Sequence, residues 1–197
     1  MQKEFPESDI STAEYYQMTP TNTLYFEDFA SNKNTTVWTG SNADRTCNVV
    51  DGCLNITAHR NISSSWANFK FPADKDYQVE IRMKSNLEDL DRLTGVLVNA
   101  TSYTYVFSLI NKDGFRVIND LGIDYLTTLP VQLYRKPTTA IKQEFHTYTI
   151  RKVGGNTLFF FNKQYKHRRD NIRLQDYGFR LDNGETITID YIKIEEF

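Results

Sequence analysis

The sequence has no basic excess, no long apolar run and few metal-ligating side chains, and each shortage excludes a class of protein. The net charge of -2 argues against nucleic acid as a partner, because neutralising phosphates requires a clear excess of Lys and Arg. No run of about 18 apolar residues occurs, so we expect no membrane span. Two Cys and three scattered His argue against a metal centre built from these residue types.

The two cysteines are too few for a disulfide framework and are badly placed for a single bridge. Cys47 and Cys53 flank an Asp51-Gly52 turn. In a two-residue hairpin Cys47 would oppose Ile56 and Cys53 would oppose Val50, and alternation of side chains then directs the two sulfurs to opposite faces. Because sulfurs on opposite faces cannot bridge without rearrangement, we expect free, mostly buried thiols.

The N-terminus lacks a basic region followed by an apolar core, so no signal peptide is evident. The compartment is therefore left open: secreted, periplasmic or cell-surface if a signal was trimmed, and otherwise cytoplasmic. Residues 1–22 are polar and without a clean period, which predicts a loosely ordered arm. Residues 23–197 predict one β-sandwich domain, since all-β sandwiches often reach this size.

Short runs rich in β-branched and aromatic residues, bounded by Gly, Asn, Asp and Pro, follow the arm. Thirteen Phe and twelve Tyr favour strands, and no helical period exceeds two turns. The spacing is typical of an all-β sandwich or barrel. We predict strands over 23–29, 46–50, 53–58, 65–71, 77–85, 93–99, 103–110, 114–118, 145–153, 157–162, 176–181 and 186–195.

Alternation within two segments assigns faces. In 77–85, Val79, Ile81 and Met83 point inward, whereas Gln78, Glu80, Arg82 and Lys84 point outward, so one face is hydrated. A turn at Gly154-Gly155 pairs Ile150 with Phe159, and a turn one residue later pairs it with Phe161. Both registers place one set of side chains in the core and another on a half-polar face, which is solvated or lines a groove. The core set is Tyr148, Ile150, Phe159 and Phe161; the other is Thr147, Thr149, Arg151, Leu158, Phe160 and Asn162.

The last segment, 186–195, alternates less cleanly. Ile187 and Ile189 share one face, and Ile192 and Ile194 share the opposite one. A β-bulge near Asp190-Tyr191 reconciles them.

The order of these motifs resembles the concanavalin A-like lectin/glucanase superfamily over about residues 23–197. The motifs are Leu24–Phe29 with Trp38, Val50–Ile56 with its Asp-Gly turn, Asp76–Ile81, Gly95–Val98, Tyr105–Leu109, Asp113–Val117, Tyr148–Asn162 and Tyr177–Ile192. The resemblance implies a two-sheet antiparallel jelly-roll sandwich with adjacent first and last strands. It covers lectins, glycosidases, laminin G-like modules and adaptors, so the fold does not settle the function.

No catalytic motif accompanies the resemblance. The glycosidase branch of the superfamily carries Glu-x-Asp-x-Glu or Glu-x-Asp-x-x-Glu on one strand, with one acid as nucleophile and another as general acid. Glu88–Asp91 lies in a turn-like loop, and Glu185 to Asp190 has the wrong spacing. The sequence therefore leans away from an enzyme, and carboxylates contributed by different strands remain the alternative.

Sugar binding needs an aromatic ring for the apolar sugar face and polar groups for the hydroxyls. Some candidate ligand-binding residues have a purely structural alternative. Glu80 and Arg82 could instead form a surface ion pair, and the basic segment 163–170 could be a solvated loop. Segment 119–144 contains Pro130 and Pro137, which predicts a long loop that crosses one sheet and walls a groove with Tyr125 and Tyr134. The candidate ligand-binding residues are Trp66, Phe160, Arg151, Asn162, Glu80, Arg82, Tyr134 and Tyr165.

Calcium is the one cofactor that the resemblance suggests. Oxygen ligands from Asp28, Glu27 and Asp190 would lie close if the terminal strands pair; the alternative is that these acids only face solvent. We expect a non-catalytic binding module for carbohydrate or protein. The alternatives are a glycoside hydrolase or lyase with carboxylates from different strands, and a structural or protein-interaction accessory domain.

Overall fold

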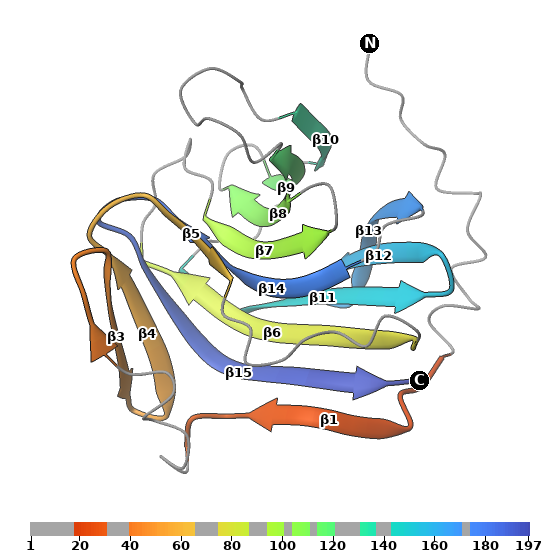
Figure 1. The fold of residues 1–197 in the computed structure, drawn as a ribbon, viewed down its shortest axis with the longest axis horizontal. Helices are drawn as coiled ribbons and strands as arrows, with labels where there is room; N and C mark the ends of the chain where they lie inside the picture. The colour runs from red at the N-terminus through yellow and green to blue at the C-terminus, as the bar shows by residue number, and fades with distance from the viewer. Residues whose placement is uncertain are drawn as a thin grey trace.

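The computed structural model of the chain is built from strands (Figure 1). All regular elements of the described residues are strands, and no helix there could cross a membrane. Most of the arm predicted over 1–22 lies outside the residues that the structure describes. Trp66, a candidate ligand-binding residue, also lies outside them. The structure describes residues 18–30, 40–65, 75–86, 94–100, 104–110, 114–120, 131–136, 143–170 and 174–197.

The strands form two antiparallel sheets, as the predicted two-sheet jelly-roll sandwich requires (Figure 1). The nine-stranded sheet runs β13-β12-β11-β6-β15-β4-β3-β2, and β1 also pairs with β15. The six-stranded sheet runs β10-β9-β8-β7-β14-β5. The larger sheet comprises β1 (Asn22–Glu27), β2 (Gly40–Ser41), β3 (Arg45–Val50), β4 (Cys53–Ala58), β6 (Tyr77–Ser85), β11 (His146–Val153), β12 (Asn156–Phe161), β13 (Gln164–Asp170) and β15 (Thr186–Glu196). The smaller comprises β5 (Ile62–Ser65), β7 (Gly95–Ala100), β8 (Thr104–Ile110), β9 (Gly114–Asp120), β10 (Val131–Lys136) and β14 (Leu174–Leu181).

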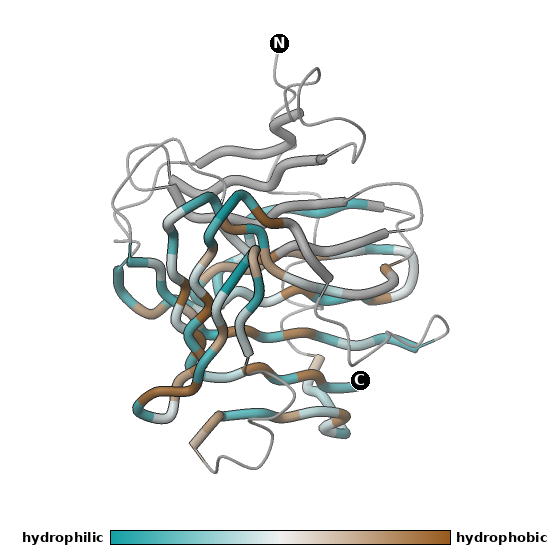
Figure 2. The backbone as a smooth tube through the Cα atoms, turned by 60° about the vertical axis from the view of Figure 1, so that its left-hand side comes forward, coloured by the Kyte–Doolittle hydropathy of each residue, from teal (hydrophilic) through white to brown (hydrophobic). Residues whose placement is uncertain are grey.

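One hydrophobic core joins side chains of the two sheets. Hydrophobic and hydrophilic residues succeed one another along the strands (Figure 2), so each sheet buries one face. Val79, Ile81 and Met83 are buried as predicted. Tyr177 and Phe179 of β14 meet them from the smaller sheet in the same core cluster.

The hairpins match the sequence predictions. Ile150 pairs with Phe159, which is the register of a Gly154-Gly155 turn. Cys47 pairs with Ile56 and Val50 with Cys53, and both cysteines are free.

The terminal strands are also as expected. β1 and β15 pair, so the first and last strands are adjacent. The register of β15 on β6 shifts between Ile189 and Tyr191, where the bulge was predicted. This bulge lets Ile189 and Ile192 both reach the core.

Two segments interpreted as loops are strands instead. Residues 164–170 form β13 because Asn162 and Lys163, with φ of 48° and 65°, make a tight turn in the left-handed region. Val131–Lys136 forms β10 within the segment 119–144. Pro130 and Pro137 flank this strand rather than interrupt it, and β10 is an edge strand, where Pro is tolerated. β5 (Ile62–Ser65) was not predicted at these bounds, and of the strand predicted over 65–71 only Ser65 lies within the described residues.

Candidate functional site

The outward face of β11, β6 and β15 carries rows of polar side chains, because alternate residues of these strands point away from the core. We call this surface the outward face. Strand registers align its side chains across the three strands. Its rows are Thr147, Arg82 and Tyr191; Thr149, Glu80 and Lys193; and Arg151, Gln78 and Glu195.

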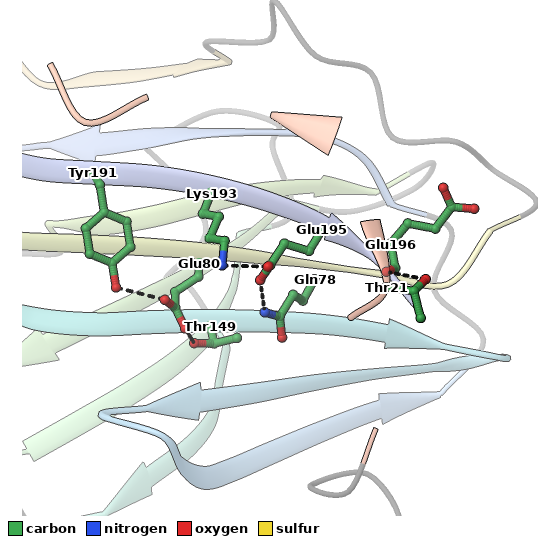
Figure 3. Close-up of polar contacts among 8 residues, drawn as sticks. All are labelled: Thr21, Gln78, Glu80, Thr149, Tyr191, Lys193, Glu195 and Glu196. Carbon is green, nitrogen blue, oxygen red and sulfur yellow. Dashed lines mark hydrogen bonds and ion pairs between the residues drawn. The ribbon is translucent and has the colours of Figure 1, made fainter. Parts of the chain in front are cut away.

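Glu80 lies at the centre of the outward face and is held from both sides (Figure 3). The Tyr191 hydroxyl donates to Glu80 Oε1 at 2.8 Å, and the Thr149 hydroxyl donates to Oε2 at 3.4 Å. Burial, together with the hydrogen bond to Glu80 and the charge of Glu80, raises the pKa of Tyr191 to about 12. Tyr191 therefore remains a neutral hydrogen-bond donor over the physiological pH range.

Glu195 forms the second part of the network in Figure 3. Lys193 Nζ lies 2.5 Å from Glu195 Oε1, and Gln78 Nε2 donates to Oε2 at 2.5 Å. The Lys193 side chain is 34% exposed and that of Glu195 only 12%. The ammonium group is thus the part of this ion pair that a ligand in solution can reach.

Arg82 does not pair with Glu80, which corrects the ion-pair interpretation of these two residues. Its guanidinium binds the Asp190 carboxylate instead and lies 5.0 Å from the centre of the Phe145 ring. The bulge at Asp190 brings this acid beside Arg82. Both predicted residues are on the outward face, but each has a partner from β15 that sequence spacing does not reveal.

Phe26 adds an exposed aromatic ring to the outward face and was not predicted. It pairs with Lys193 across β1 and β15, it is 52% exposed, and its ring centre is 6.3 Å from that of Tyr191. The adjacent Glu27 is buried and accepts a hydrogen bond from the Phe29 backbone N–H at 2.9 Å. Hydropathy alone predicts that Phe26 is buried and Glu27 exposed. Only the pairing of the terminal strands, combined with strict alternation along β1, could have placed Phe26 on the outward face.

Phe160 and Tyr165, both candidate ligand-binding residues, contact each other, but Phe160 is covered. The two rings meet edge to face with centres 5.9 Å apart. The Arg151 guanidinium lies 5.4 Å from the Phe160 ring centre and 5.2 Å from that of Phe197, and it donates to the Met18 carbonyl at 3.4 Å. Phe160 is 3% exposed, so this cluster packs the β12 side of the sheet rather than presenting a bare ring.

Asn162 is exposed but serves the turn before β13. Its Oδ1 accepts a hydrogen bond from the Thr147 backbone N–H at 3.0 Å, and its amide nitrogen lies 3.0 Å from His146 Nδ1. Tyr134 is in β10 of the other sheet, away from the strands of the outward face, and only its backbone is described. The structure therefore brings together Glu80, Arg82 and Arg151, but not Tyr134.

The three acids considered for calcium make other contacts. Glu27 accepts the hydrogen bond from the Phe29 backbone N–H, and Asp190 pairs with Arg82. Asp28 is exposed and accepts a hydrogen bond from the Ala30 backbone N–H at 3.1 Å. No group of three or more potential metal-ligating side chains occurs among the described residues. Calcium binding by Asp28 and Asp190 stays a prediction.

Comparisons with known proteins identify the fold but no sequence relative. No family model matches the chain, and no curated protein matches it by sequence.

Solved structures do match. An endo-acting O-glycanase of the human gut microbiota has a TM-score of 0.61 at 9% identity, over 89% of this chain and 99% of its own. The β-glucanase of Bacillus licheniformis has a TM-score of 0.59 at 13% identity, over 91% and 100%. The carbohydrate-binding module CBM66 of Bacillus subtilis has a TM-score of 0.50 at 11% identity, over 80% and 96%. The chain therefore has the concanavalin A-like jelly-roll fold.

Proposed function

We propose that the chain is a non-catalytic module that binds carbohydrate on the outward face, beside Phe26. The observation that carries this proposal is an exposed aromatic ring next to partly exposed polar side chains, among them Lys193, whose side chain is 34% exposed. Phe26 is 52% exposed and lies opposite Lys193 in the strand register. A ring for the apolar sugar face and fixed donors and acceptors for the hydroxyls are what saccharide recognition requires.

The polar groups near Phe26 are held in place before any ligand binds. Tyr191 and Thr149 orient Glu80, and Glu195 orients the Lys193 ammonium group. Side chains that are already ordered lose less rotamer entropy on binding, which favours affinity. The remaining N–H groups of Lys193 are donors for sugar hydroxyls.

The structural neighbours support a carbohydrate-related function without separating binding from catalysis. They include a β-glucanase and an O-glycanase, which are enzymes, and a carbohydrate-binding module. All have under 15% identity to this chain, so the choice depends on the chain's own side chains.

A glycoside hydrolase is the second candidate, because two carboxylates lie on neighbouring strands of the outward face. Glu80 pairs with Lys193 and Glu195 with Gln78, so the two acids are diagonal neighbours. The backbones of diagonal positions are roughly 7–8 Å apart, close enough for long side chains to bring their carboxyl groups within the roughly 5–9.5 Å that glycosidases use. We favour binding because Lys193 and Gln78 already hold Glu195.

A glycan array followed by calorimetry tests the proposal. For a glycan that binds, Phe26→Ala should weaken the affinity about tenfold, since loss of ring stacking costs roughly 1–1.5 kcal/mol. Val50→Ala is the matched control, because Val50 is also an exposed large hydrophobic residue, at 45%, and it should leave the affinity unchanged. Equal affinity of the Phe26→Ala variant and the unaltered chain would refute the assigned site.

The same glycans distinguish binding from hydrolysis. Each bound glycan is incubated with the protein and analysed for shorter products. Intact glycans support the binding module. Cleavage that is lost in Glu80→Gln and in Glu195→Gln would instead establish the hydrolase, and absence of binding to any glycan would favour an accessory domain.

A further inference from the structure

We propose that the Lys84 end of the outward face binds a monovalent oxyanion carried by a sugar, and so selects acidic over neutral saccharides. This inference rests on the proposed carbohydrate-binding function and assigns the ligand class. The feature that carries it is a pair of cations on one strand, of which only Arg82 is paired with an acid among the described residues.

Arg82 and Lys84 lie two residues apart on β6 and point to the same side of the sheet. Both contact one ring: Arg82 Cζ is 5.0 Å from the Phe145 ring centre, and Lys84 Nζ is 4.6 Å from it. The ring attracts both cations through its negative face. It therefore holds two like charges at neighbouring positions, where their mutual repulsion is unfavourable.

Of the two cations, only Arg82 has a counter-ion among the described residues. Arg82 binds Asp190, whereas Lys84 makes no ion pair among the residues that the structure describes, and Phe145 is its contact there. Among the described residues, one positive charge on this part of the surface thus has no acid paired with it. An incoming oxyanion would gain a charge-assisted hydrogen bond from Lys84 without displacing a carboxylate of those residues.

Neutral hydrogen-bonding groups continue the row beyond Lys84. Thr188 pairs with Lys84 across β15 and β6, and its hydroxyl donates to Asn55 Oδ1 at 2.7 Å. The amide nitrogen of Asn55 carries N–H groups that can donate to a further oxygen. An ammonium group beside amide and hydroxyl groups suits a carboxylate or sulfate ester on a sugar that also presents hydroxyls.

The proposed oxyanion-binding position at Lys84 adjoins the proposed carbohydrate-binding surface beside Phe26. Arg82 pairs with Tyr191 in the strand register, and the Tyr191 ring lies next to that of Phe26. One saccharide chain lying across β6 and β15 would therefore contact both parts. Uronic acids and sulfated sugars carry the required charge, and the test treats them separately.

Calorimetry with three oligosaccharides of equal length tests the inference: an oligogalacturonate, its neutral galacto-oligosaccharide counterpart, and a sulfated galacto-oligosaccharide. At least one acidic probe should bind roughly fivefold more tightly than the neutral one, the size expected of one partly exposed ion pair. Lys84→Gln should abolish this preference, and Lys84→Arg should retain it. Arg60→Gln, which removes a charge whose partner is Asp44, should also retain it.

The outcomes separate this inference from the proposed function. Binding of acidic and neutral probes with equal affinity, or a preference that survives in Lys84→Gln, would overturn the acidic subsite and leave glycan binding intact. Failure of these probes together with every glycan of an array would refute the proposed function itself. The relative affinity for the uronate and the sulfated probe identifies which anion is preferred.

A chemical footprint provides an independent readout. Lys84 and Arg82 both contribute to the electrostatic environment of the Cys53 thiol, which is half-buried near the start of β4. A bound acidic oligosaccharide should slow the reaction of Cys53 with a thiol reagent, and the neutral probe at equal concentration should slow it less. An unchanged rate under saturating acidic probe would contradict the proposed position.

Discussion

Protonation of His167 should destabilise the fold between neutral pH and pH 4. His167 is buried on β13 and its ring centre is 6.1 Å from that of Phe159. Burial, and secondarily the charge of Arg169, lower the pKa of His167 to about 4 from its ordinary 6.5. Because the unfolded chain binds this proton more readily, the free energy of unfolding should fall as the pH decreases from about 6.5 toward 4.

The size of the effect follows from the shift in pKa. The lowered pKa corresponds to a loss of about 3 kcal/mol once the pH is well below both pKa values. Linkage gives a loss of about 2–3 kcal/mol at pH 4.5 and about 1 kcal/mol at pH 5.5. Above pH 7 the histidine is neutral in both states and contributes no pH dependence.

Urea unfolding at pH 7.5, 5.5 and 4.5 measures this contribution. His167→Gln should reduce the change in unfolding free energy between pH 7.5 and 4.5 by about 2–3 kcal/mol relative to the unaltered chain. His59→Gln is the control, because His59 is exposed and contacts the Thr46 hydroxyl, and it should leave most of that change in place. Identical pH dependence of the His167→Gln variant and the unaltered chain would refute the reasoning.

Two further predictions concern the core and the thiols. Phe159→Ala should lower the unfolding free energy by about 3–5 kcal/mol, whereas Val50→Ala should change it by less than about 0.5 kcal/mol. Urea titration of both variants measures these losses, and equal losses would contradict the assigned core. In the native protein a thiol reagent should modify Cys53 before the buried Cys47. Both reactions should be quicker at alkaline pH, because burial raises the pKa of both thiols. Equal rates for the two cysteines would contradict the structure.

The sequence predicted those parts of the fold that depend on local chemistry. Alternation in 77–85 and the glycine turn at 154–155 assign faces and register without knowledge of the partner strands. β13 was missed because its turn uses Asn162 and Lys163 in the left-handed region rather than a glycine. β10 was missed because the flanking prolines resemble loop signals, although an edge strand accepts them.

The site was predictable only in part, for a reason of distance along the chain. Alternation places Glu80 and Arg82 on the outward face, but Tyr191, the donor to Glu80, is 111 positions away. The bulge that brings Asp190 to Arg82 depends on the register of β15 on β6. Phe26 faces outward because β1 pairs with β15, a long-range fact that its own hydropathy contradicts.

The location of the glycan-binding surface is tested most directly by NMR titration of the labelled chain with a glycan that binds on an array. The account predicts that shift changes concentrate on Phe26, Glu80, Tyr191 and Lys193, along β1, β6 and β15, and are small on β7, β8 and β14. Changes concentrated on the six-stranded sheet, with those four residues unaffected, would contradict it.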